Sequence, residues 1–390
     1  MPKTFASRLS RLGTESAFDV LARAKDLEKQ GKSIVHLEIG EPNFDTPGNI
    51  VAAAKKALDD GYTHYTPSAG CNELRETIAK YISRTRNINA KVENVVVTPG
   101  AKPIIFYSIF ALAEAGDEVV YPNPGFPIYE SVINYSGAKA VPIKIRKDRN
   151  FKFDIDDFRN AVSEKTKLVI LNSPHNPTGG LLTEKELEVV AECAQEYDFW
   201  VLSDEVYEYI IYNGEFKSIV NMPNMLDRTI LLNGFSKTYA MTGWRLGYGV
   251  MPQELAKTIA KMITNCESCT SSFTQIAGIE ALEGEQDFVK YMVKELETRR
   301  DVMVQGINAI EGLYAEKPDG AFYLFIDVSK FSKNSKEIAD FLLESEGVAV
   351  LDGKCFGSFG DGFIRLSYAA SMENIVEGLK RIKSGIAKLS

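Results

Sequence analysis

The sequence lacks the features that would place the protein in a membrane or outside the cell. No stretch of 18 consecutive apolar residues occurs in the 390-residue chain. Its first residues lack the apolar run and small-residue cleavage pattern of a signal peptide. The five cysteines are odd in number and scattered, unlike a secreted disulfide framework. We therefore expect a cytoplasmic protein with no membrane partner.

Positive charge and metal-binding side chains are also scarce. Lysine and arginine number 45 against 53 acidic residues, and the formal net charge of −8 argues against a nucleic-acid partner. The three histidines are spaced in a way that suggests no metal site. Cys266 and Cys269 form a single CxxC with no histidine nearby, which favours a structural role. We expect no bound metal.

What the sequence does contain is a series of short, β-branched apolar runs, each followed by a helical pattern. Such runs are typical of buried strands that alternate with helices. They predict an α/β fold whose large domain has a mostly parallel central sheet flanked by helices. The expected strands are 95–97, 119–121, 168–171, 200–202 and 230–232.

The chain changes character near residue 285. A long charged helical pattern over 287–310 leads into alternating segments at 321–328 and 363–368, which indicate a smaller α+β domain. The N-terminal segment, with a helical pattern at 17–30, is expected to pack with that small domain. We therefore predict an N-terminal segment at 1–45, a large domain at 46–284 and a small domain at 285–390.

Polar residues follow several expected strands at the edge where such sheets bind ligands. Asn172 and Asn176 lie in a turn rich in proline and glycine, and Asp204 and Tyr207 follow the strand at 200–202. Each pattern also fits a plain structural role, as a turn held by asparagine or as a helix cap. After 95–97, a small-residue turn leads into a helix whose unpaired N–H groups suit a phosphate.

Lys237 follows the last expected strand, among small and aromatic residues. Partial burial there would lower the pKa of its amine and favour nucleophilic chemistry. Arg245, eight residues later, carries a guanidinium suited to a phosphate. Most lysines are simply solvated, but these surroundings favour a reactive one.

These motifs together resemble the fold-type I pyridoxal-phosphate (PLP) aminotransferases of class I/II, the aspartate aminotransferase-like family. The likeness extends over nearly the whole chain. It is carried by GEPNFDTP at 40–47, by the segments 172–179 and 236–245, and by FIRLS at 363–367.

The resemblance implies residue roles toward PLP. Lys237 would form the Schiff base and then act as the general base, Asp204 would pair with the ring nitrogen, and Tyr207 and Asn176 would hydrogen-bond the phenolic oxygen. Phe126 would stack on the ring. The phosphate would be held by a group of residues: Gly100, Ala101, Lys102, Ser236, Arg245, and Tyr65 of a neighbouring subunit in a homodimer.

The resemblance also implies a substrate site for an amino acid and a 2-oxo acid, used in turn by a ping-pong mechanism. Arg365 would clamp the α-carboxylate, supported by Asn172 or Gly40. Glu15 lies in a segment that lines the substrate side chain in relatives, where a carboxylate would favour basic or neutral amino acids. An exposed glutamate at a helix start is the alternative interpretation of Glu15.

Two other functions fit the same scaffold. A PLP-dependent lyase or synthase, for instance one that catalyses β-elimination, would use the same lysine, aspartate and arginine. A PLP-sensing regulator would need a DNA-binding extension, and none precedes residue 30. The sequence therefore favours an aminotransferase and leaves its substrate open.

Overall fold

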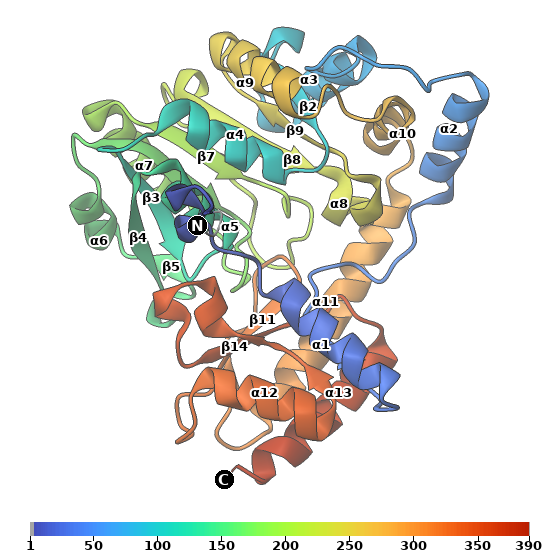
Figure 1. The fold of residues 1–390 in the computed structure, drawn as a ribbon, viewed down its shortest axis with the longest axis vertical. Coiled ribbons are helices and arrows are strands. Elements are labelled where there is room, and N and C mark those ends of the chain that lie inside the picture. The colour runs from blue at the N-terminus through green and yellow to red at the C-terminus, as the bar shows by residue number, and fades with distance from the viewer. Residues whose placement is uncertain (1–3, 390) are drawn as a thin grey trace.

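The computed structural model describes residues 4–389 and contains an eight-stranded central sheet (Figure 1). The strand order is β2-β9-β8-β7-β6-β3-β4-β5. Strands β3, β4, β6, β7 and β8 pair in parallel, whereas β2, β9 and β5 join their neighbours antiparallel. The strands are β2 (Val95–Thr98), β3 (Glu118–Asn123), β4 (Lys139–Arg146), β5 (Lys152–Phe153), β6 (Thr166–Asn172), β7 (Trp200–Asp204), β8 (Thr229–Gly234) and β9 (Gly247–Val250).

The predicted α/β fold with a mostly parallel sheet is confirmed, and the five expected strands correspond to β2, β3, β6, β7 and β8. Strands β4, β5 and β9 were not predicted. Strand β4 alternates exposed lysines with apolar residues and contains Pro142, and β9 contains two glycines. Neither therefore shows the continuous apolar run of a buried parallel strand.

Helices cover both faces of the sheet because alternate strand residues point to opposite sides. In β6, Leu168 and Ile170 pack into one apolar cluster with α4, α5 and α9, whereas Val169 and Leu171 pack into another with α6 and α7. These helices, with those at the β2 end of the sheet, are α2 (Gly48–Asp59), α3 (Asn72–Arg86), α4 (Lys102–Leu112), α5 (Ile128–Ser136), α6 (Ile155–Ala161), α7 (Glu184–Tyr197), α8 (Phe235–Thr238), α9 (Gln253–Cys266) and α10 (Ser272–Glu283).

A second body of structure lies below the large sheet in Figure 1 and joins the two ends of the chain. Its four-stranded sheet has the order β10-β11-β14-β13, and β1 pairs with β12 in parallel. Val35 and Leu37 share an apolar cluster with Leu296 and Ile382. Its elements are α1 (Ala17–Lys29), β1 (Val35–His36), α11 (Asp287–Asn308), β10 (Tyr314–Ala315), β11 (Tyr323–Asp327), α12 (Ser335–Glu346), β12 (Val348–Ala349), β13 (Leu351–Asp352), β14 (Phe363–Ser367) and α13 (Met372–Ala387).

Neither a membrane-spanning helix nor a metal-binding cluster of side chains occurs among the described residues. Over residues 4–389, no helix is long and apolar enough to cross a bilayer. Within the same range, no cluster of three or more histidine, cysteine, aspartate or glutamate side chains is arranged to hold a metal ion.

Candidate active site

The carboxyl ends of β6, β7 and β8 meet at one edge of the large sheet, beside β11 and β14 of the smaller body. A cavity of about 490 Å³ opens there. Most of the residues singled out in the sequence line it: Glu15, Gly40, Ala101, Lys102, Phe126, Asn172, Asn176, Asp204, Tyr207, Ser236, Lys237, Arg245 and Arg365. The structure thus brings together side chains that lie more than 300 residues apart in the sequence.

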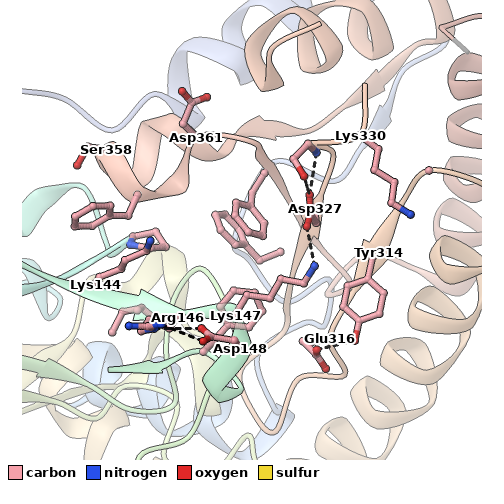
Figure 2. Close-up of a pocket in the computed structure, with 18 residues that line it drawn as sticks. Lys144, Arg146, Lys147, Asp148, Tyr314, Glu316, Asp327, Lys330, Ser358 and Asp361 are labelled. Atoms are coloured by element: carbon pink, nitrogen blue, oxygen red, sulfur yellow. Dashed lines mark hydrogen bonds and ion pairs between the residues drawn. The ribbon is translucent and has the colours of Figure 1, made fainter. Parts of the chain in front are cut away.

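A larger cavity of about 840 Å³ lies elsewhere, between β4 and the strands β10, β11 and β14 (Figure 2). Its charged groups largely neutralise one another, since Lys147 pairs with Asp327 at 2.7 Å and Arg146 with Asp148 at 3.1 Å. None of the predicted site residues lines this cavity. Volume alone therefore does not identify the reactive site.

Lys237 lies in α8, directly after β8, and its side chain is partly buried. Its Nζ donates a hydrogen bond to the carbonyl oxygen of Gly40 at 2.6 Å. Desolvation lowers the pKa of the amine to about 8, although Glu15 and Glu41 raise it. About a tenth of the amine is therefore neutral, and so nucleophilic, at pH 7.

Asp204 ends β7 and is buried beneath the cavity. Burial raises the pKa of its carboxyl to about 6, opposed by a hydrogen bond of 2.6 Å that the Tyr129 hydroxyl donates to Oδ2. No helix follows directly, so the helix-cap interpretation of Asp204 does not apply. A buried carboxylate in this position favours a cationic group above it.

Arg365 comes from β14 and is buried at the opposite wall. Its guanidinium lies over the rings of Tyr323 and Phe356, 4.5 and 4.9 Å from their centroids. Nη1 donates to Asn176 Oδ1 at 3.3 Å and Nη2 donates to the Glu38 carbonyl, but Nε has no partner within residues 4–389. Desolvation lowers the pKa of Arg365. An unpartnered, buried cationic donor suits an anionic ligand.

The end of the cavity near α4 is rich in donors. Helix α4 begins at Lys102 without a side-chain cap. Pro103 has no N–H and the N–H of Ile104 donates to the Ala101 carbonyl, so the Lys102 N–H is the donor that this helix start offers to a ligand. Arg245 is held by the carbonyl oxygens of Thr242 and Pro99, at 3.0 and 3.3 Å. Gly100 has φ +87° and does not itself line the cavity, but a Cβ there would lie 2.1 Å from Arg245 Nη2. Glycine is therefore needed for this close approach.

Three predicted residues have surroundings that the sequence did not indicate. The Asn172 amide bonds to backbone atoms of Asp204 and Asn176, at 3.1 and 2.8 Å, and Asn176 rather than Asn172 contacts Arg365. Glu15 is only 22% exposed and forms an ion pair with Lys102, so the interpretation as an exposed helix-start glutamate is wrong. Tyr65 lies outside the cavity and is 89% exposed in the single chain.

Two tyrosines in the cavity wall were missed. Tyr129 lies three residues after Phe126, a spacing that could have placed both on one side of the turn into α5. Tyr323 lies in β11 and bonds to Tyr207, hydroxyl to hydroxyl, at 2.7 Å. Nothing near Tyr323 in the sequence indicates this long-range contact.

Known proteins are similar to this chain over nearly its whole length. The family model described as "Aminotransferase class I and II" matches residues 32–382. The probable aspartate/prephenate aminotransferase of Aquifex aeolicus is 39% identical, with all of both chains covered. The aspartate aminotransferase of Pyrococcus horikoshii is 39% identical over 98% of this chain and 97% of its own.

Solved structures agree as well. The crystal structure of the aspartate aminotransferase from Rhizobium meliloti superposes with a TM-score of 0.94 at 35% identity and covers 100% of both chains. Sequence and fold likeness therefore extend over the whole length, including every strand end that carries the site. The chain belongs to the class I and II aminotransferase family.

Proposed function

We propose that the protein is a PLP-dependent aminotransferase that moves the α-amino group of an amino acid to a 2-oxo acid by a ping-pong mechanism. The observation that carries the proposal is Lys237, whose amine has a lowered pKa and lines the same cavity as the buried carboxylate of Asp204. A nucleophilic amine, a buried anion and the buried cation of Arg365 are the three groups that this chemistry requires.

The residues present fit PLP. Bound PLP supplies an aldehyde that bonds to amines and a ring that accepts electrons from the substrate carbon. We assign Asp204 to the ring nitrogen, since its buried carboxylate gains a cationic partner there. Tyr207 and Asn176 would hydrogen-bond the phenolic oxygen, and the half-buried Phe126 would stack on the ring.

The donor-rich end of the cavity would hold the phosphate. The uncapped start of α4 and the exposed guanidinium of Arg245 support this assignment. The proposed phosphate-binding residues are Gly100, Ala101, Lys102, Ser236, Arg245, and Tyr65 of a partner subunit. Lys102 is already paired with Glu15, so its ammonium would be shared between the phosphate and the substrate side.

Arg365 would bind the α-carboxylate of the amino acid or 2-oxo acid, with Gly40 and Asn172 close by. Its Nε, which has no partner within residues 4–389, and the two rings packed against the guanidinium favour binding of a planar carboxylate along the Nε edge. That pairing would hold the substrate carbon near Lys237. The lysine amine, freed from the cofactor, would then act as the general base that moves the proton from Cα.

A half-reaction distinguishes transfer from the lyase alternative. The holoenzyme is mixed with one equivalent of an amino acid, and products are measured by absorbance and mass spectrometry. We expect one equivalent each of pyridoxamine phosphate and 2-oxo acid. Release of ammonia and pyruvate with PLP regenerated would instead support β-elimination. A panel of amino donors against 2-oxoglutarate, pyruvate and oxaloacetate would then identify the substrates.

Glu15 offers a test of substrate preference. Its carboxylate lines the cavity beside Lys102, whose ammonium lies 5.7 and 5.4 Å from the ring centroids of Phe18 and Phe126. We propose that Glu15 favours basic or neutral amino acids, because a dicarboxylic substrate would have to displace it from Lys102. The Glu15→Gln variant should therefore raise kcat/KM for aspartate relative to lysine by roughly two- to fivefold. The effect is modest because the Glu15–Lys102 ion pair is partly exposed to solvent.

The matched control is Asp26→Asn, which breaks an exposed ion pair with Lys29 on the same helix, away from the cavity. It should leave the ratio of kcat/KM values unchanged. An unchanged substrate profile in the Glu15→Gln variant would rule out the proposed preference. The relatives named above are described as aspartate and aspartate/prephenate aminotransferases, so aspartate belongs in the panel.

We further propose a cytoplasmic homodimer with the domain limits expected from the sequence: 1–45, 46–284 and 285–390. Support for the division is the pairing of β1 with β12 and the apolar cluster shared by Val35 and Leu296. Ser7–Arg11 differ from the expectation, since they contact α5 of the large domain. Support for the dimer is the exposure of Phe5 and Tyr65, each 89%. Sedimentation with and without a Tyr65 substitution would test it.

A further inference from the structure

Tyr323 lies where the main groups of the site meet. It is the first residue of β11, is only 2% exposed and lines the cavity. Its hydroxyl oxygen lies 2.7 Å from that of Tyr207 and packs so closely on Gly40 that a Cβ there would be 2.1 Å away. The carbonyl of the same glycine accepts the hydrogen bond from Lys237.

We propose that Tyr323 is a positioning residue of the aminotransferase site with two separable parts. Its ring fixes the plane of the Arg365 guanidinium, and its hydroxyl fixes the hydroxyl of Tyr207. The inference rests on the proposed function, since it assumes that Arg365 binds the substrate carboxylate and that Tyr207 bonds to the cofactor.

The ring contact restricts the arginine directly. The guanidinium of Arg365 packs against two rings, those of Tyr323 and Phe356. The two Nη atoms are held by Asn176 and the Glu38 carbonyl, which leaves Nε as the unpartnered donor. Two aromatic faces prevent the guanidinium from tilting, so the edge that must meet a carboxylate keeps one orientation.

The hydroxyl contact restricts Tyr207 in a different way. Tyr207 is 3% exposed, and the Tyr323 hydroxyl is its only side-chain hydrogen-bond partner within residues 4–389. A phenol has one hydrogen to donate and can accept others. If the Tyr323 hydroxyl donates to the Tyr207 oxygen, the hydrogen of the Tyr207 hydroxyl is left to point at the cofactor. Because the Tyr207 hydroxyl then accepts one hydrogen bond, it becomes a stronger donor in the other. A phenylalanine at 323 would remove this effect and keep the ring.

The hydroxyl is tested in the holoenzyme by the pH midpoint of the visible absorbance of the lysine-bound cofactor. Tyr323→Phe should raise this midpoint by about half a pH unit, because a weaker donor at Tyr207 stabilises the deprotonated form less. Tyr207→Phe should raise it further, and the double variant should match Tyr207→Phe alone. Tyr368→Phe, which removes another buried hydroxyl 3.3 Å from the Ala321 carbonyl, should leave the midpoint unchanged.

The ring is tested by kinetics. Tyr323→Leu should raise KM for both the amino acid and the 2-oxo acid roughly three- to tenfold, as expected for loss of one stacking face. Tyr323→Phe should keep both KM values. An unchanged midpoint in Tyr323→Phe, or additive shifts in the double variant, would overturn the hydroxyl role, and an unchanged KM in a folded Tyr323→Leu variant would overturn the ring role. Failure of the proposed function is distinct, since the wild-type protein would then show no lysine-bound absorbance, or would release ammonia with PLP regenerated in the half-reaction.

Discussion

Replacing Lys237 with alanine should lower turnover by about four orders of magnitude and abolish the visible absorbance of the lysine-bound cofactor. Within residues 4–389, Lys237 is the lysine that lines the cavity and has a lowered pKa, so its loss should prevent both covalent attachment and proton transfer from Cα. Absorbance spectra, steady-state assays, and mass spectrometry after borohydride reduction would measure the two losses separately.

Lys257→Ala provides the matched control. Lys257 lies on α9, is 59% exposed and pairs only with Glu254, so its loss should change neither the spectrum nor turnover. After reduction of the wild-type holoenzyme, the added mass should be on the peptide that contains Lys237. Full turnover in the Lys237→Ala variant, or label on another lysine, would refute the assignment.

The sequence predicted the parts of the fold and site that obey local rules. Buried parallel strands produce continuous apolar runs, and their carboxyl ends carry Asn172, Asp204 and, one turn into α8, Lys237. Strands β4, β5 and β9 gave no such signal because they are exposed on one face, very short or rich in glycine. The local sequence pattern therefore located the site residues at the ends of the parallel strands, but it did not predict all strands of the sheet.

Contacts between residues far apart in the sequence could not be predicted from local sequence patterns. Tyr129 reaches Asp204 from α5, and Tyr323 reaches Tyr207 from β11, over separations of 75 and 116 residues. The pairing of Glu15 with Lys102 spans 87 residues and joins a segment expected at the substrate to one expected at the phosphate. The Tyr323–Tyr207 and Glu15–Lys102 contacts form because β11 and the N-terminal segment pack against the edge of the large sheet.

The buried Asp204 leads to a second prediction with a large effect, in which activity and stability change in opposite directions. Asp204→Asn keeps the shape of the side chain and an oxygen that can accept from Tyr129, but it removes the negative charge. Without that charge to pair with the ring nitrogen, turnover should fall by about a thousandfold. Steady-state assays at saturating PLP would measure the loss.

The same substitution should stabilise the cofactor-free protein. Because burial raises the pKa of the Asp204 carboxyl from 3.8 to about 6, ionising it costs the folded state roughly 3 kcal/mol at neutral pH. The cost is absent well below pH 3.8, where the carboxyl is protonated in both folded and unfolded chains, grows between pH 3.8 and pH 6, and is nearly complete above pH 6. Thermal unfolding of the cofactor-free proteins should therefore show Asp204→Asn melting higher at pH 7.5, with the difference shrinking as the pH falls from 6 toward 3.8 and below.

Glu192→Gln controls for the loss of a carboxylate, because Glu192 is exposed on α7 and should change neither activity nor melting by much. A lower melting temperature for cofactor-free Asp204→Asn at pH 7.5 would contradict the argument. If the variant is instead more stable and inactive, the buried Asp204 carboxylate destabilises the cofactor-free wild-type protein until the cationic ring nitrogen of the cofactor binds beside it. A carboxylate that lowers the stability of the cofactor-free protein and is needed for activity is expected to serve cofactor binding and not folding.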